Sequence, residues 1–271
     1  MDTASESVFG YDAGVPLELT ERGRESVHGA SVRDVSFASP GGGEIPAYLV
    51  VPEEEGPFPG VLFLHWGAGN RTEFLADALT LAASGAVSLM IDAPHLRPGW
   101  VPFAFRMDAA KEREYFTQLV VDLRRSVDAL EELGEVDAAR VAFVGHSLGA
   151  TVGGAFAGVD DRIRAVVLMG GLPIPTPMPG TGDEMAAQYR EAFSSISSGA
   201  LIGSSTAEVL FQFARFDRHV PEDQAAAYVD AAGDGAEARF YATSHEFNDA
   251  ASRRERLAWI AEKLGLGSVA E

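Results

Sequence analysis

The sequence contains no cysteine. It can therefore form no disulfide, offers no thiolate nucleophile, and lacks the residues that iron–sulfur clusters and cysteine-based zinc sites require. No run of 18 apolar residues occurs, so no membrane-spanning helix is predicted. The first ten residues hold no apolar segment of the kind that a secretory signal has, and we expect a cytoplasmic protein.

Positive charge is also scarce, because the 271 residues carry a formal net charge of −19. Nucleic acids and anionic membrane surfaces select basic patches, so neither is an expected partner. Strong acidity can equally be a solubility adaptation to salt, which would say nothing about chemistry. With 46% hydrophobic residues, the chain has enough apolar side chains for the large core of an enzyme-sized protein.

The apolar pattern predicts strands alternating with helices. An alternating stretch over residues 31–52, interrupted by Pro40 and three glycines, predicts an antiparallel hairpin. Segments with helical spacing follow, the clearest over 120–133, and they predict a doubly wound, mostly parallel α/β sheet with this hairpin at its N-terminal side. Short apolar runs that suit strands buried on both faces span 60–65, 86–92, 140–145, 165–170, 208–216 and 238–242.

The pattern also predicts the domain organisation. We expect residues 1–30 to form an N-terminal extension and residues 31–271 a single domain. Two segments, 94–107 and 172–205, do not fit the alternation of strands and helices and are rich in proline or aromatic residues. Long insertions of this kind are often lids or binding loops, and a plain surface excursion is the alternative.

One motif carries the strongest chemical signal. An apolar run leads directly into Gly145-His146-Ser147-Leu148-Gly149 and then into small residues that can open a helix. A strand, a tight turn and a helix form the context in which a nucleophilic serine stands at the carboxyl edge of a sheet. Such a turn has no room for side chains beside the serine, which explains the two glycines. Ser147 is therefore the predicted nucleophile.

A serine hydroxyl needs an adjacent base, normally a histidine that a carboxylate orients. On this type of sheet the chain order is serine, acid, histidine. Asp217 follows the run 208–216 and precedes a helix start near Pro221, so it is the predicted acid, with a helix-capping role as the alternative. Asp183 is the weaker substitute. His245 lies after a further strand and before the last helix, and it is the predicted base.

Two backbone N–H groups should form an oxyanion hole. Leu148, directly after the nucleophile, is expected to supply one of them. The loop after the run 60–65 should supply the other, and we expect Trp66, with Gly67 as the alternative. Four aromatic side chains of the two insertions are expected to line an apolar substrate pocket: Trp100, Phe103, Phe105 and Phe193.

These motifs resemble the α/β-hydrolase superfamily, and within it the dienelactone-hydrolase-like and prolyl-oligopeptidase-like branch. The resemblance spans residues 32–266 and excludes the first thirty. Dienelactone hydrolases proper use a cysteine nucleophile and basic residues for a dianionic substrate, whereas this acidic chain has Ser147. The resemblance therefore implies a fold with a Ser-Asp-His triad and a small neutral ester as substrate. It rests on Leu64-His65-Trp66-Gly67, Gly145-His146-Ser147-Leu148-Gly149, Asp217 with Val220-Pro221, and His245.

The sequence thus predicts a serine carboxylesterase that forms an acyl-enzyme and needs no metal or organic cofactor. A homodimer is common among such enzymes, but nothing in the sequence demonstrates one, so the oligomeric state stays open. The same triad can cleave amides, thioesters or carbon–carbon bonds, because fold and triad do not fix the leaving group.

Two further interpretations stay open. The chain could be a catalytically silent relative that binds a small ligand, although all three triad residues are present in order. The second interpretation is a metal site, with ligands at His65, His146 or Asp217-Arg218-His219. No pair of these residues on a predicted helix has the spacing of metal ligands.

Overall fold

The computed structural model describes residues 8–98 and 107–267, and a nine-stranded sheet forms their centre. The strand order is β1-β2-β3-β5-β4-β6-β7-β8-β9. Strands β4 to β9 are parallel, whereas β1, β2 and β3 run antiparallel and join the parallel part at β5. The strands are β1 (Thr20–Val27), β2 (Ala30–Ala38), β3 (Glu44–Pro52), β4 (Phe58–Leu64), β5 (Val87–Ile91), β6 (Val136–His146), β7 (Ile163–Met169), β8 (Glu208–Ala214) and β9 (Glu237–Tyr241).

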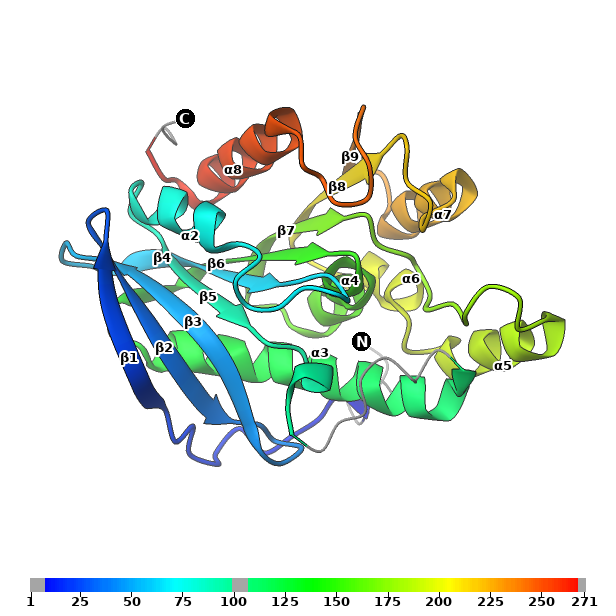
Figure 1. The fold of residues 1–271 in the computed structure, drawn as a ribbon, viewed down its shortest axis with the longest axis horizontal. Helices are drawn as coiled ribbons and strands as arrows, with labels where there is room; N and C mark the ends of the chain where they lie inside the picture. Colours follow the sequence, from blue (N-terminus) through cyan, green and yellow to red (C-terminus); the bar gives the residue numbers. More distant parts are fainter. Residues whose placement is uncertain (1–7, 99–106, 268–271) are drawn as a thin grey trace.

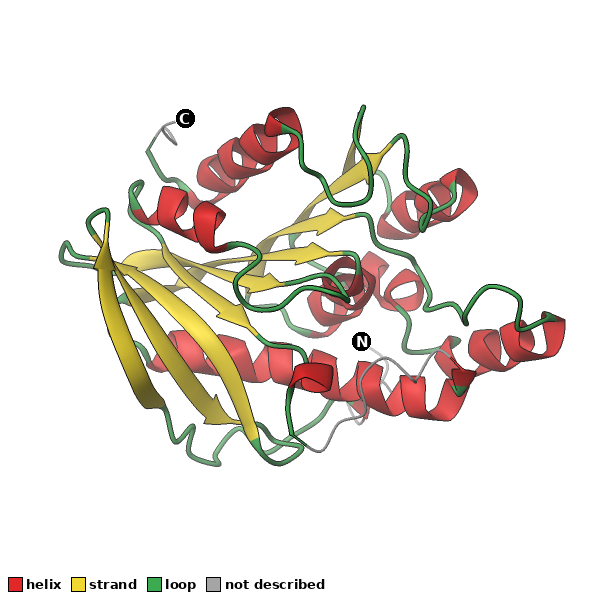
Figure 2. Ribbon diagram, in the orientation of Figure 1, coloured by secondary structure: helices red, strands yellow, loops and turns green. Residues whose placement is uncertain are grey.

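Helices cover both faces of the sheet (Figures 1 and 2). On one face, α2 and α8 bury side chains such as Leu81 and Ile260. On the other face, α3, α4 and α7 bury Leu123, Phe156 and Tyr228. The helices are α2 (Leu75–Ala82), η1 (Pro94–Leu96), α3 (Ala109–Glu132), α4 (Leu148–Val159), α5 (Asp183–Phe193), α6 (Ser198–Leu201), η3 (Ile202–Ser204), α7 (Glu222–Ala232) and α8 (Ala250–Leu264).

The predicted doubly wound, mostly parallel α/β sheet is confirmed. All five residues of β5 and six of the seven in β4 are buried, because helices lie on both of their faces. This explains why these strands read as continuous apolar runs rather than as alternating ones. None of the helices within 8–98 and 107–267 combines the length and the apolar character needed to cross a bilayer.

The N-terminal hairpin is larger than expected. β2 and β3 pair as predicted, with Val35 opposite Ala47, but β1 adds a third antiparallel strand inside the expected extension 1–30. The sequence of β1, Thr20–Val27, is almost entirely polar and seven of its eight residues are exposed, so no apolar alternation marked it. A charged edge strand of this kind resists pairing with other chains.

Residues 8–17, which we call the N-terminal segment, are fixed along α3. Phe9 is fully buried in the core. Its carbonyl oxygen accepts a hydrogen bond of 2.7 Å from the Arg124 guanidinium, and the Tyr11 hydroxyl donates to the Asp128 carboxylate at 2.8 Å. This segment of the expected extension is therefore attached to the core, in which Phe9 and Leu17 are buried.

The two insertions differ in what the structure describes. Residues 94–98 begin with η1, while Trp100, Phe103 and Phe105 lie outside the described residues. The insertion 172–205 contains α5, α6 and η3, which its proline-rich start did not predict. α5 packs against α3, where the rings of Phe193 and Phe116 meet edge to face at 5.4 Å.

The burial of Phe9 generates a stability prediction. Phe9→Ala should lower the free energy of unfolding by about 3–5 kcal/mol, because a fully buried ring is removed and a cavity remains. Urea denaturation followed by tryptophan fluorescence measures this change. Val15→Ala is the matched control in the same segment, since Val15 is 50% exposed, and it should stay within about 0.5 kcal/mol. Equal effects of the two substitutions would contradict the packing described.

Candidate active site

Ser147 occupies a strained turn between β6 and α4. Its backbone has φ 52° and ψ −99°, a conformation that residues other than glycine rarely adopt. A Cβ atom on Gly145 would lie 2.4 Å from the carbonyl carbon of Gly149, and one on Gly149 would lie 2.3 Å from the Leu64 carbonyl oxygen. The two glycines are therefore required for α4 to approach the sheet, as the sequence predicted.

Three side chains from three loops meet at this turn. The Ser147 hydroxyl lies 2.8 Å from His245 Nε2, and His245 Nδ1 lies 2.8 Å from Asp217 Oδ2. Asp217 follows β8 and His245 follows β9, so the parallel strands deliver all three residues to one edge of the sheet. The His245 and Asp217 side chains are 6% and 3% exposed, which shields their interaction from water.

The Asp217 carboxylate is held in its ionised form. Burial opposes this, but hydrogen bonds from His245 and from the backbone N–H groups of His219 and Val220 outweigh it and keep the pKa of Asp217 below its ordinary value. An ionised Asp217 accepts a hydrogen bond from the N–H at His245 Nδ1, which leaves Nε2 free to accept the Ser147 proton. Asp183, the substitute acid, lies exposed in the first turn of α5.

The backbone donors near Ser147 differ from the expectation at one position. Leu148 is the first residue of α4, so its N–H has no acceptor within the helix. The Trp66 N–H, however, donates to Glu73 Oε2 at 2.8 Å and is not available to a substrate oxygen. The choice of Trp66 is therefore wrong for this structure. Gly67, the alternative, lines the cavity at Ser147, and within the described parts of the chain its N–H has no acceptor.

Two buried histidines support the loop after β4. His65 Nδ1 donates to the Trp66 carbonyl oxygen at 2.6 Å, and Nε2 accepts from the Ala93 N–H at 3.0 Å. One acceptor and one donor fix a neutral tautomer, and burial lowers the pKa of His65 accordingly. His95 lies 5.8 Å away, ring to ring, and hydrogen-bonds to Tyr115. Burial, with a smaller effect of His65, lowers the pKa of His95 to about 4.

A cavity of about 530 Å³ opens beside Ser147. Its wall is mainly apolar, and residues 175–179 of the second insertion form part of it. Phe193, expected to line the cavity, does not, because it is fully buried behind Phe116, which does. The lining also includes residues that were not expected to line a substrate pocket: His95, Glu112, Tyr115, Phe116, Thr151 and Arg218.

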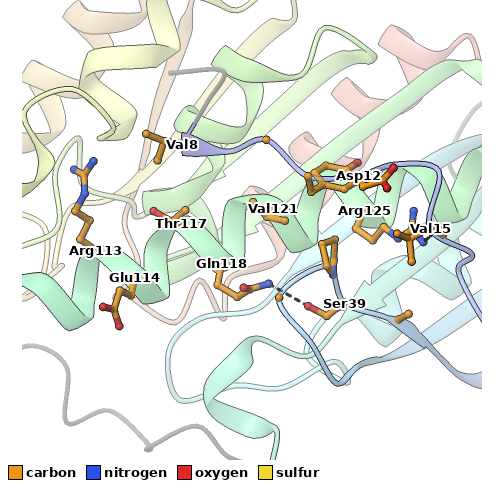
Figure 3. Close-up of a pocket in the computed structure, with 15 residues that line it drawn as sticks. Val8, Asp12, Val15, Ser39, Arg113, Glu114, Thr117, Gln118, Val121 and Arg125 are labelled. Carbon is orange, nitrogen blue, oxygen red and sulfur yellow. Dashed lines mark hydrogen bonds between the residues drawn. The ribbon is translucent and has the colours of Figure 1, made fainter. Parts of the chain in front are cut away.

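A second cavity, of about 540 Å³, lies between the N-terminal segment and α3 (Figure 3). Thr117, Val121 and Arg125 of α3 form one side, and Val8 and Asp12 form the other. It contains none of the predicted site residues, so the chemistry of Ser147 belongs to the first cavity.

The histidines proposed as metal ligands have other partners. His65 bonds to two backbone groups, and the two nitrogens of His146 face the Glu73 carboxylate and the His245 carbonyl oxygen. Over residues 8–98 and 107–267, no cluster of three or more histidine, aspartate or glutamate side chains could hold a metal ion. Glu73 itself is a site residue that sequence reasoning missed, because no motif distinguishes it among 40 acidic residues.

The close approach at Gly149 leads to a prediction. Gly149→Ala should lower the free energy of unfolding by about 1–3 kcal/mol and slow the labelling of Ser147, because the new Cβ meets a backbone carbonyl that cannot rotate away. Thermal denaturation and fluorophosphonate labelling measure the two effects. Gly134→Ala is the control, since nothing lies within 4 Å of its added Cβ. Normal labelling of Gly149→Ala would contradict the tight contact.

The lowered pKa of His95 predicts a pH dependence of stability. Between about pH 4 and the ordinary value of 6.5, the unfolded state binds a proton at this histidine and the folded state does not. Stability should therefore fall as the pH drops through this window. His95→Gln should lose less stability than the wild type between pH 6.5 and 4.5 in urea titrations. His28→Asn, at an exposed turn, should keep the wild-type profile, and identical profiles for all three proteins would refute the assignment.

Comparison with known proteins places the chain in a family. The family model described as acetyl xylan esterase (AXE1) matches residues 14–171, which include the Ser147 turn and the loop after β4 but end before Asp217 and His245. The esterase FrsA of Salmonella paratyphi B is 31% identical over 146 residues, which cover 52% of this chain and 32% of that protein. The chain thus spans about a third of the length of these curated relatives.

Solved structures share the fold. The acetyl xylan esterase from Paenibacillus sp. R4 has a TM-score of 0.78 at 20% identity, over 96% of this chain and 92% of that chain. Acetyl xylan esterase 1 from Thermoanaerobacterium sp. JW/SL YS485 has a TM-score of 0.79 at 17% identity, with the same coverage. The resemblance to the α/β-hydrolase superfamily is confirmed. Because the family model matches more than half of its residues, the chain belongs to the acetyl xylan esterase (AXE1) family.

Proposed function

We propose that the protein is a serine esterase in which Ser147 is the nucleophile, His245 the general base and Asp217 the residue that orients His245. The observation that carries this proposal is the pair of 2.8 Å hydrogen bonds linking Ser147 Oγ, the two His245 nitrogens and Asp217 Oδ2. This geometry is what an activated serine requires. Membership of the acetyl xylan esterase family and the similarity to FrsA support the choice of ester substrates.

The reaction follows from the positions of the protons. Ser147 Oγ attacks the ester carbonyl carbon while His245 Nε2 takes the hydroxyl proton, and Asp217 stabilises the imidazolium that results. The tetrahedral intermediate collapses, the bond to the alcohol oxygen breaks, and His245 returns the proton to that oxygen. A water molecule then attacks the acyl-enzyme with the same base, which releases the carboxylic acid and restores Ser147.

The Gly67 and Leu148 N–H groups are the proposed oxyanion donors. Leu148 stands at the N-terminus of α4, where the helix dipole also favours negative charge. Gly67 replaces Trp66 in this role because the Trp66 N–H is already bonded to Glu73. Donors held before the substrate arrives need no reorganisation during the reaction, and each is typically worth about 10²- to 10³-fold in rate.

Small neutral esters are the proposed substrates. The cavity of about 530 Å³ is mainly apolar around Ser147, with residues 175–179 in its wall, and it suits an uncharged acyl or alcohol group. The names of the structural neighbours make acetyl esters the first group to test. The homodimer that is common among such enzymes stays untested.

Hydrolysis of p-nitrophenyl esters from acetate to decanoate tests the proposal. Ser147→Ala should lower kcat/KM by at least about 10³-fold, because removal of the nucleophile disables the whole triad. Ser194→Ala, at an exposed position of the second insertion, is the matched control and should keep wild-type activity.

Two outcomes would overturn parts of the proposal. A wild-type protein that is inert on every ester but is labelled by a fluorophosphonate at Ser147 would retain the nucleophile and discard the substrate class, in favour of amides, thioesters or carbon–carbon bonds. An absence of both hydrolysis and labelling would favour a silent ligand-binding relative.

A further inference from the structure

Glu73 connects two parts of the site that have different roles. It lies in the turn before α2, and its side chain is 19% exposed. Oε2 accepts the Trp66 N–H at 2.8 Å, and Oε1 lies 2.5 Å from His146 Nδ1. One carboxylate therefore contacts both the loop after β4, which carries Gly67, and the turn that carries Ser147.

His146 extends this connection to the loop that carries His245. The His146 side chain is 3% exposed, and its Nε2 lies 2.7 Å from the backbone oxygen of His245. The Trp66 indole stacks on the imidazole with ring centroids 5.8 Å apart and an interplanar angle of 13°. The Phe247 ring meets the imidazole edge to face at 5.6 Å. His146 is thus fixed by contacts on its edges and faces.

The partners of His146 also determine how many protons it holds. His65 lies between one acceptor and one donor and needs a single ring proton. His146 lies between a carboxylate and a carbonyl oxygen, neither of which can donate when Glu73 is ionised. Nε2 must carry a proton, and a second proton lies between Nδ1 and Glu73 Oε1. The 2.5 Å separation of Nδ1 and Oε1 requires this second proton, because without it two acceptors would face each other.

We propose that Glu73 and His146 are positioning residues, and that their partly buried carboxylate–imidazolium pair holds the Gly67 loop and the His245 main chain in one fixed arrangement around Ser147. Neither side chain lines the cavity. Both act through other residues: Glu73 through the Trp66 N–H, and His146 through the His245 carbonyl oxygen. The inference rests on the proposed esterase function for its effect on rate, but the pair itself is independent of it.

The pair is also electrostatically suited to its place. The His146 and His245 rings are 5.4 Å apart, centroid to centroid. The Asp217 carboxylate faces His245 at its Nδ1. A lone imidazolium at this distance would oppose the positive charge that His245 gains during catalysis. Glu73 neutralises it, so His146 can donate two hydrogen bonds without adding net charge beside the base.

Two substitutions of Glu73 separate its geometry from its charge. In Glu73→Ala, both the Trp66 N–H and His146 Nδ1 lose their acceptor. In Glu73→Gln, the amide oxygen can still accept the Trp66 N–H, and the amide N–H can donate to a neutral His146 that keeps its proton on Nε2. The glutamine variant therefore preserves every contact, and His146 carries one proton fewer than in the wild type.

The activity test uses p-nitrophenyl acetate at a temperature well below the unfolding of every variant. Glu73→Ala should lower kcat by about 10²-fold with KM changed less than about 3-fold, the size of loss that a misplacement of about 1 Å causes. Glu73→Gln should recover kcat to within about 5-fold of the wild type, since the positions are kept. Glu135→Gln, which removes an ion-pairing carboxylate from Arg33 at the surface, is the control and should match the wild type.

The protonation test does not depend on activity. Long-range ¹H–¹⁵N spectra at pH 8 should show His146 with both nitrogens protonated in the wild type and one protonated nitrogen in Glu73→Gln, with His65 as the singly protonated reference. A singly protonated wild-type His146 would overturn the ion pair. A Glu73→Ala protein with kcat within about 3-fold of the wild type would overturn the positioning role. An equal loss of kcat in Glu73→Ala and Glu73→Gln would overturn it as well. Failure of the esterase proposal would show separately, as a wild type that hydrolyses no ester.

Discussion

The contact between α4 and the sheet is the constraint on which the site depends. α4 starts so close to β4 that no side chain fits at Gly149, and Ser147 is left in a backbone conformation that costs energy. Strain of this kind persists only where the surrounding packing enforces it. Here the enforcement comes from a sheet buried by helices on both faces, because strands that cannot shift also fix the loops at their carboxyl ends. The hydrogen bonds of Ser147 and His245 are a consequence of this rigidity.

The sequence predicted those parts of the fold that leave a periodic or steric signature. Strands covered on both faces appear as apolar runs, and the turn at Ser147 appears as two glycines at a fixed spacing. β1 left no such signature, since its residues are mostly polar and exposed and its place in the sheet comes from pairing with β2. Phe193 was misplaced for a related reason: an apolar residue in an insertion has the same pattern whether it faces a cavity or the core.

Hydrogen-bond partners were beyond prediction because they depend on the fold. Whether the Trp66 N–H is available depends on Glu73, seven residues later in a turn, and the sequence does not show which way that carboxylate points. Three histidines of the site also differ only in their partners. His65 bonds to two backbone groups, whereas His146 bonds to a carboxylate and a carbonyl oxygen. His245 bonds to an aspartate and a serine.

The N-terminal segment has a consequence for the order in which the protein folds. The Arg124 guanidinium that binds the Phe9 carbonyl lies 115 residues further along the chain, and the Asp128 that binds Tyr11 lies 117 residues away. Contacts of such high sequence separation form slowly, since the intervening chain must first lose its freedom. During synthesis residues 8–17 leave the ribosome before α3, and the surface of α3 that binds them does not exist until more than a hundred further residues have followed. These residues can therefore dock only after α3 has been made.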